Sequence, residues 1–168
     1  MCYLIAIALA TPAAEARKII EAAGFSARDS VNPHVRNIFP RRSATRIEVT
    51  NGMCSCDLIN HPRPALDDTK ERLRYKDKGW SDAKIDRALA AKRNARHRPA
   101  VRKQSLEFAR VVQELVAVTG SVSILTHFYN GAFDDETIEK KPEVTHSAAQ
   151  FLANSGALSA DVVVHVTR

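Results

Sequence analysis

The Asn51-Gly52 pair constrains the fold of this chain more than any other feature of its sequence. It lies between two short runs, 45–50 and 53–59, in which apolar and polar side chains alternate. A type I′ turn needs positive φ at both central residues, and Asn-Gly adopts that conformation readily. The sequence therefore predicts a β-hairpin with one strand at 45–50, a two-residue loop and a second strand at 53–59.

The register of this hairpin determines how Cys54 and Cys56 are interpreted. A two-residue loop places Val49 opposite Cys54. It places Ile47 opposite Cys56, and successive side chains point to opposite faces of a strand. Both cysteines then share an apolar face with Leu58, where a free cysteine packs as a small hydrophobe. Packing is the leading interpretation of these two cysteines.

Thiol or metal chemistry is the alternative interpretation. Cys-x-Cys differs from the Cys-x2-Cys spacing of common zinc sites, and no second pair follows in the sequence. No metal site and no cofactor are therefore predicted, and the candidate ligands for a metal are Cys54, Cys56 and His61. Cys2 is a further thiol, and its approach to the other two is left open. It is also the candidate catalytic residue, because removal of the initiator methionine would place its thiol beside a free amine.

Length and cysteine content indicate a single reduced domain. A chain of 168 residues is long enough to bury a hydrophobic core. Its three cysteines are an odd number without a secretory framework, which predicts a cytoplasmic location. The apolar run at 3–9 is shorter than a bilayer requires and is predicted to be a buried strand, so no membrane partner is expected.

Periodicity and turn residues place the other elements. Besides the hairpin, we expect strands at 3–9, 121–129 and 161–167, and a short strand near 35–39 within an irregular stretch, 26–44. We expect helices at 12–23, from 67 to about 78, after Ser81, from about 100 to 118, and at 144–155.

This order of elements predicts an α+β fold with a mainly antiparallel sheet and additional helices in the middle of the chain. A ferredoxin-like split βαβ core is one topology that fits, and in it the first strand lies beside the second arm of the hairpin. We treat the chain as one α+β domain, 1–168, that carries a basic helical element at about 66–103.

The positive charge of the chain is concentrated in that element. The formal net charge is +6, whereas residues 70–103 contain thirteen Lys or Arg and four acids, which leaves +9 for the segment and −3 for the rest. On the helix after Ser81, the basic side chains between 92 and 97 fall on one face. The candidate binding residues are Lys92, Arg93, Arg96, His97, Arg98, Arg102, Lys103, Tyr75 and Trp80.

A basic face with nearby aromatic side chains is typical of nucleic-acid binding, although no base-reading motif accompanies it here. An acidic protein would be attracted by the same charges, and a merely solvated face is the third interpretation. The sequence thus predicts a non-enzymatic cytosolic binding protein for an acidic macromolecule. That partner is an acidic protein, as in an immunity or antitoxin-type neutraliser, or nucleic acid. The alternative is a thiol- or metal-dependent enzyme centred on Cys2, Cys54 and Cys56.

Overall fold

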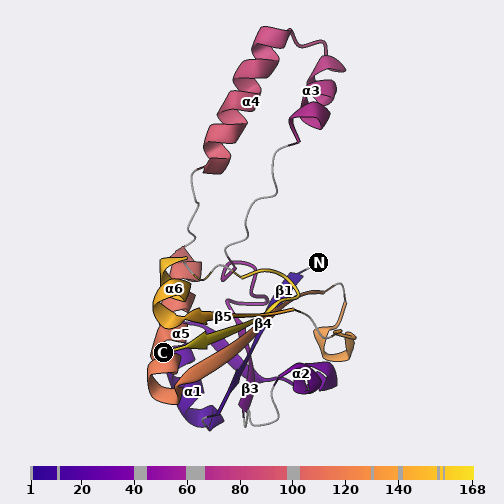
Figure 1. Ribbon diagram of the computed structural model, residues 1–168. Coiled ribbons are helices and arrows are strands. Elements are labelled where there is room, and N and C mark those ends of the chain that lie inside the picture. The colour runs from indigo at the N-terminus through magenta and orange to yellow at the C-terminus, as the bar shows by residue number, and fades with distance from the viewer. Residues whose placement is uncertain are drawn as a thin grey trace. The chain divides into compact units, whose positions relative to one another are not determined.

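The computed structural model divides into two compact units, one formed by Met1–His61 with Val101–Arg168 and the other by Pro62–Ala100 (Figure 1). We call them the sheet unit and the helical unit, and each is described by itself. The described residues are 2–10, 12–39, 45–59, 67–97, 103–129, 131–139, 142–154, 156 and 158–168, without the side chains of 94–97.

A six-stranded sheet in the order β2-β3-β1-β4-β6-β5 forms the centre of the sheet unit. Every neighbouring pair is antiparallel except β5 and β6, which run parallel. The α+β class is therefore confirmed, with a sheet that is mixed and mostly antiparallel. The strands are β1 (Cys2–Leu9), β2 (Ser26–Asp29), β3 (Thr45–Thr50), β4 (Ser121–Tyr129), β5 (Glu143–Ser147) and β6 (Val163–Thr167).

Helices cover both faces of this sheet (Figure 1). One face packs against α1 (Ala13–Ala22), α5 (Lys103–Thr119) and α6 (Ala148–Ala153). The other packs against α2 (Pro33–Ile38) and the segment around the short η1 turn (Phe133–Asp135). We call these the three-helix face and the α2 face. Among the described residues, no helix is both long enough and apolar enough to cross a bilayer.

Strand β1 is buried on both faces, as its sequence predicts. Alternate side chains point to opposite sides of a strand. Ile5, Ile7 and Leu9 therefore enter the core under the three-helix face. The small side chains of Ala6 and Ala8 lie in the core under α2. A strand without a polar face needs cover on both sides, which is why it lies in the sheet interior between β3 and β4.

The predicted second arm of the hairpin is wrong. Only Asn51 and Cys54 form an isolated bridge, and the chain then turns instead of continuing a ladder. Gly52 has a φ of +75°, but Asn51 does not reach positive φ, so the type I′ turn is not formed. The expected register is lost with it, including the pairing of the cysteines with Ile47 and Val49. The first strand pairs with β3 and β4 instead of a second arm.

Two further expectations are wrong for local reasons. The stretch near 35–39 is helix α2, because the Asn32 side chain accepts hydrogen bonds from the amides of His34 and Val35 and caps the helix. The expected helix at 144–155 begins as strand β5, and α6 starts only after Ser147, which forms a capping box with Gln150. Strand β2 also lies within 26–44, the stretch that the sequence predicts to be irregular. The remaining helices and strands lie where they were expected.

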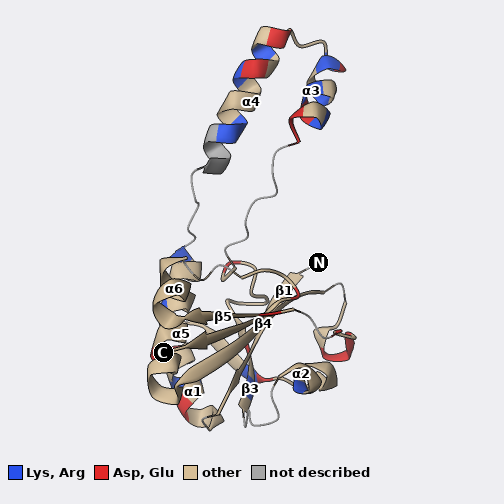
Figure 2. Cartoon of the chain, in the orientation of Figure 1, with Lys and Arg blue, Asp and Glu red and all other residues tan. Residues whose placement is uncertain are grey.

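The helical unit contains two helices, α3 (Asp68–Lys76) and α4 (Asp82–His97). The Asp67 side chain accepts a hydrogen bond from the Lys70 amide and caps α3. Among the described side chains of the helical unit, the apolar side chains of Ile85 and Leu89 on α4 are almost fully buried. Basic and acidic residues both recur along α3 and α4 (Figure 2). The unit is therefore a helix pair with a small apolar centre and a densely charged surface.

Candidate functional site

Three thiols converge at one end of β1. The Sγ atoms of Cys2, Cys54 and Cys56 all lie within 4.8 Å of one another, and each residue is partly exposed. Cys2 comes from the start of β1, whereas the other two come from the turn that follows β3. The described residues contain no second group of His, Cys, Asp and Glu side chains placed to hold a metal in this way. The chain therefore brings together all three of its cysteines.

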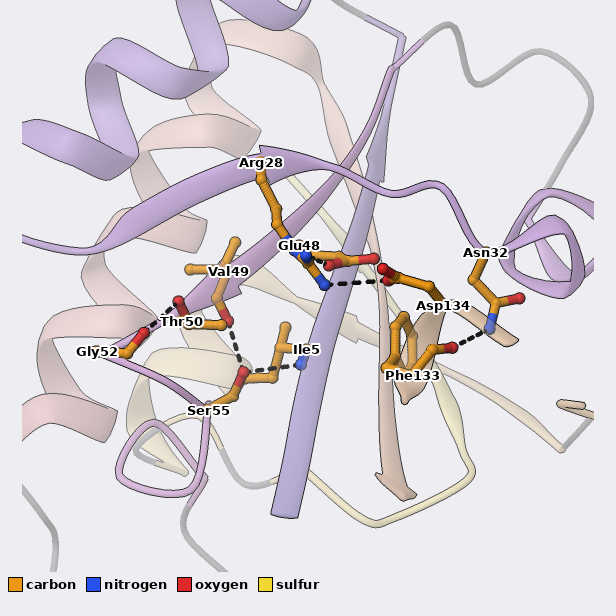
Figure 3. Close-up of polar contacts among 10 residues, drawn as sticks. All are labelled: Ile5, Arg28, Asn32, Glu48, Val49, Thr50, Gly52, Ser55, Phe133 and Asp134. Atoms are coloured by element: carbon orange, nitrogen blue, oxygen red, sulfur yellow. Dashed lines mark hydrogen bonds and ion pairs between the residues drawn. The ribbon is translucent and has the colours of Figure 1, made fainter. Parts of the chain in front are cut away.

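Ser55 explains why the turn reaches β1. Its side chain is fully buried and bridges two strands: Oγ accepts a hydrogen bond from the Ile5 amide at 2.9 Å and donates one to the Val49 carbonyl at 2.6 Å (Figure 3). The Ser55 amide donates to the Tyr3 carbonyl at 2.9 Å. Ser55 therefore fixes the turn after β3 against β1. This contact holds its sequence neighbours, Cys54 and Cys56, near the start of β1.

The pKa values of Cys54 and Cys56 are shifted in opposite directions. A hydrogen bond from the Cys56 backbone lowers the pKa of Cys54. Burial raises the pKa of Cys56, although its sulfur accepts a hydrogen bond from the Tyr3 amide at 3.4 Å. Cys54 is therefore the thiol of the two that ionises more readily, and a thiolate is the form that binds metal or attacks an electrophile.

Tyr129 lies beside the thiol cluster, and no pattern in the sequence predicts this position. It is the cross-strand partner of Cys2, and its ring meets Phe133 edge to face at 5.7 Å. Burial raises the pKa of Tyr129, and the negative charge of the nearby cysteines raises it further. Tyr129 is therefore kept as a neutral phenol that can donate a hydrogen bond. Neither Tyr129 nor Ser55 has a sequence signal, because their roles depend on which strands become neighbours.

The three sulfur atoms lie close enough together to be ligands of one metal ion. Zinc binds cysteine sulfur at 2.3 Å, so tetrahedral coordination places its sulfur ligands about 3.8 Å apart. Three sulfurs within 4.8 Å of one another surround such a position after small side-chain rotations. His61, the predicted additional ligand, lies outside the described residues. The catalytic role of Cys2 stays a prediction.

The predicted basic face is distributed over both units. Lys92, Arg93, Tyr75 and Trp80 belong to the helical unit, whereas Lys103 begins α5 in the sheet unit. Arg96 and His97 lie in α4, but their side chains are not described. Arg98 and Arg102 lie outside the described residues. The structure therefore describes the surroundings of five of the nine candidate side chains.

Acids of α3 neutralise part of this basic face. Lys92 Nζ lies 2.6 Å from Glu71 Oε2, and Arg93 is paired with Asp68. These hydrogen bonds raise the pKa of Lys92 and of Arg93, so both side chains stay charged. Both remain substantially exposed, and an exposed pair loses much of its attraction to solvent screening. A partner with a higher density of negative charge can compete with these acids.

The aromatic side chains of the helical unit stack on each other. The ring centroids of Tyr75 and Trp80 are 4.6 Å apart with an angle of 15° between the planes. Lys84 lies over Trp80 at 4.1 Å from its centroid, and Lys92 lies over Tyr75 at 5.0 Å. The rings therefore already have cation–π partners, and a nucleic-acid base would have to displace a lysine to stack there.

No family model, no curated protein and no solved structure matches this chain.

Proposed function

We propose that the sheet unit binds a thiophilic metal ion through Cys2, Cys54 and Cys56, with zinc as the expected ion. The observation that supports this proposal is the mutual approach of the three sulfur atoms to within 4.8 Å. Thiolates are preferred ligands of zinc, and three protein ligands leave a fourth tetrahedral position for water or a substrate. The partial exposure of all three cysteines suits such an open position.

Titration of the reduced, full-length protein with zinc tests this proposal, and cadmium serves as a spectroscopic probe through its thiolate charge-transfer absorption. We expect one ion per chain. Replacement of outer partners of a metal typically lowers affinity about 10- to 100-fold, so loss of a ligand in Cys54→Ser should lower it at least about 100-fold. Met53→Ala is the matched control, because Met53 is 97% exposed in the same turn. Equal affinity of the Cys54→Ser variant, or no binding by the reduced protein, would overturn the proposal.

A reducing compartment is the natural setting for this site. Free thiols persist in the cytosol and are oxidised to disulfides in secreted proteins. We therefore propose a cytoplasmic location, supported by three cysteines whose side chains are reduced thiols in the structure. Fractionation of the native host with an antibody to the chain tests it. Recovery in a secreted or periplasmic fraction would contradict it.

We propose a ferredoxin-like split βαβ core for the fold itself. Support comes from the partial strand order β2-β3-β1-β4, in which every pair is antiparallel. Helices α1 and α5, which precede β2 and β4, pack in one core cluster on the same face. The parallel β5–β6 pair would then extend this core at the β4 edge. An experimental structure with a different strand order would refute this assignment.

We also propose that the helical unit binds an acidic macromolecule, nucleic acid or an acidic protein. The supporting observation is the charge of this unit, because residues 62–100 contain twelve Lys or Arg and six acids, which leaves a formal charge of +6. Most of the described basic side chains in that segment are exposed. Electrostatic attraction to such a surface is sequence-independent and falls as salt concentration rises. An immunity or antitoxin-type neutraliser of an acidic protein is one role that would use it.

Binding to heparin and to duplex DNA at several salt concentrations tests this second proposal. The triple substitution Arg93/Arg96/Arg98→Ala should weaken binding and lower its dependence on salt. The matched control is Arg36/Arg110/Arg168→Ala, which removes the same charge from the sheet unit. Unchanged binding in the first triple variant, or an equal loss in both, would refute the proposal.

A further inference from the structure

Three polar side chains from adjacent strands form a hydrogen-bonded chain on the sheet. The hydroxyl of Ser123 on β4 lies 2.9 Å from Nδ1 of His165 on β6. Nε2 of the same ring lies 3.3 Å from a carboxylate oxygen of Glu143 on β5. Strands β4, β6 and β5 are consecutive in the sheet. A hydroxyl, an imidazole and a carboxylate connected in this order are the components of an activated nucleophile.

The strand register places these side chains on one face. Ser123 and His165 are direct cross-strand partners. His165 is also the partner of Thr145, and Glu143 lies two residues before Thr145, which returns it to the same side of β5. Val163, two residues before His165, belongs to the apolar cluster under α2. The group therefore lies on the α2 face.

One imidazole tautomer satisfies both contacts. With the proton on Nε2, the ring donates to Glu143, and Nδ1 is left to accept the hydroxyl proton of Ser123. The carboxylate thereby holds the ring in the form in which it acts as a base. Side-chain exposure falls along the sheet, from 45% at Glu143 to 23% at His165, so the base is shielded but still accessible to a substrate.

A cation lies on the same face, across one small side chain. Ala8 on β1 is the cross-strand partner of Ser123 on one side and of Arg46 on the other. Two strand spacings separate Ser123 and Arg46 by about 10 Å at the backbone, a gap that the long arginine side chain can partly close. Arg46 Nε is buried, and none of the residues that the structure describes is its hydrogen-bond partner. Arg46 therefore adds a positive charge to the sheet face that carries Ser123.

We propose that Ser123, His165 and Glu143 hydrolyse small carboxylic esters, with Ser123 as nucleophile, His165 as general base and acid, and Glu143 as positioning residue. Ser123 Oγ bonds to the ester carbonyl carbon while its proton passes to His165 Nδ1 and the carbonyl electron pair moves onto oxygen. When this intermediate collapses, the ester C–O bond breaks and the same proton goes to the leaving alcohol. Water then repeats the sequence, releasing a carboxylic acid and restoring Ser123.

Labelling with a fluorophosphonate probe, followed by peptide mapping, tests the nucleophile in the intact protein. We expect the label on Ser123 and hydrolysis of p-nitrophenyl acetate that survives alkylation of the cysteines, since this activity does not depend on the thiol cluster. General acid–base catalysis contributes about 100- to 10,000-fold, so Ser123→Ala and His165→Gln should each lower kcat/KM at least about 100-fold.

Ser121→Ala is the matched control, because Ser121 lies two residues from Ser123 on the same face of β4. It should leave the rate unchanged. Glu143→Gln should lower kcat and leave KM unchanged, which a merely structural contact would not do. Absence of label on Ser123, loss of the activity on alkylation, or equal rates in Ser123→Ala and Ser121→Ala would each overturn the inference.

Discussion

The interactions that stabilise the sheet unit differ from those that stabilise the helical unit. Both faces of the sheet pack against apolar side chains contributed by helices, and two apolar clusters result. In the helical unit, the described apolar side chains that are almost fully buried are Ile85 and Leu89. Ion pairs join its two helices, among them Lys92 with Glu71 and Arg72 with Asp86. One unit is stabilised mainly by apolar burial and the other largely by exposed charge.

This difference determines what each unit is suited to do. Burial contributes about 25 cal/mol for each Å² of apolar surface, whereas an exposed ion pair contributes about 0–1 kcal/mol and is screened by salt. A close-packed sheet can hold side chains in a fixed geometry, as the thiol cluster and Ser123 require. The charged side chains of a helix pair can leave their internal ion pairs and form new ion pairs with a binding partner. Trp80, the single tryptophan of the chain, reports on the helical unit alone.

The largest effect should follow a cavity in the sheet unit. Phe108 of α5 is fully buried and meets Phe25 edge to face at 6.3 Å. Phe108→Ala should lower the free energy of unfolding by about 3–5 kcal/mol, because the side chain is lost and the site closes only partly. Urea unfolding followed by far-ultraviolet circular dichroism measures it. Val118→Ala on the same helix, where the side chain is 46% exposed, should change stability by less than about 0.5 kcal/mol.

The same experiment tests the separation of the units. We expect the Trp80 fluorescence transition to stay in place in Phe108→Ala and to shift in Leu89→Ala. A Trp80 transition that moves in Phe108→Ala would show that the two units unfold together. That result would contradict the independent stability of the two units.

A smaller effect should follow loss of the Ser55 bridge. Ser55→Ala removes the side-chain hydrogen bonds to the Ile5 amide and the Val49 carbonyl. A buried group left without its partner costs about 1–3 kcal/mol, which denaturant unfolding measures. Because Ser55 anchors both neighbouring cysteines, cadmium affinity should fall as well. Thr50→Val, which removes only an exposed contact with Gly52, should change neither quantity, and a similar loss there would contradict this role of Ser55.

The stability of the sheet unit should depend on pH through the buried carboxyl group of Glu48. Glu48 is 1% exposed, and burial raises its pKa above the ordinary value of 4.5 despite the contact with Arg28 (Figure 3). The folded state therefore holds this proton more tightly than the unfolded state does. The resulting stability is complete below pH 4.5 and is lost as pH rises through the folded-state pKa.

Glu48→Gln should remove this decline, so that the stability of the variant depends less on pH above 4.5 than that of the natural chain. Denaturant unfolding across the acid-to-neutral range measures the two slopes. Glu107→Gln, a change at an exposed ion pair of α5, is the control and should keep the natural slope. Identical slopes in Glu48→Gln and the natural chain would contradict the assignment of this pH dependence to Glu48.

The smallest effect should follow loss of an ion pair in the helical unit. Asp86→Asn removes the charge that α4 presents to Arg72 of α3. We expect the Trp80 transition to shift by about 0.2–1 kcal/mol at low salt. The shift should disappear near 1 M salt, where the screening length falls to about 3 Å. A loss that persists in high salt would mean that packing, and not charge, holds the two helices together.

Local signals predicted the elements that depend on neighbours in sequence. The predicted helices at 12–23 and from about 100 to 118 correspond to α1 and α5 within a few residues. The capping residues Asn32 and Ser147 set where α2 and α6 begin, and beside each of them the predicted type of element is wrong. The predicted second arm of the hairpin does not form, because the Ser55 side chain is hydrogen-bonded to the backbone of β1 and β3 and the chain turns there. The tertiary context of Ser55 outweighed a strong turn preference.

By itself, the sequence determined that β1 is buried on both faces, that the middle of the chain is helical and basic, and that its cysteines are few. Each of these follows from composition or from a period of a few residues. The meeting of Cys2 with Cys54 and Cys56, and of Ser123 with His165 and Glu143, was decided by tertiary structure alone. These residues are brought together by the order of strands in the sheet, which depends on long-range packing that no local pattern encodes.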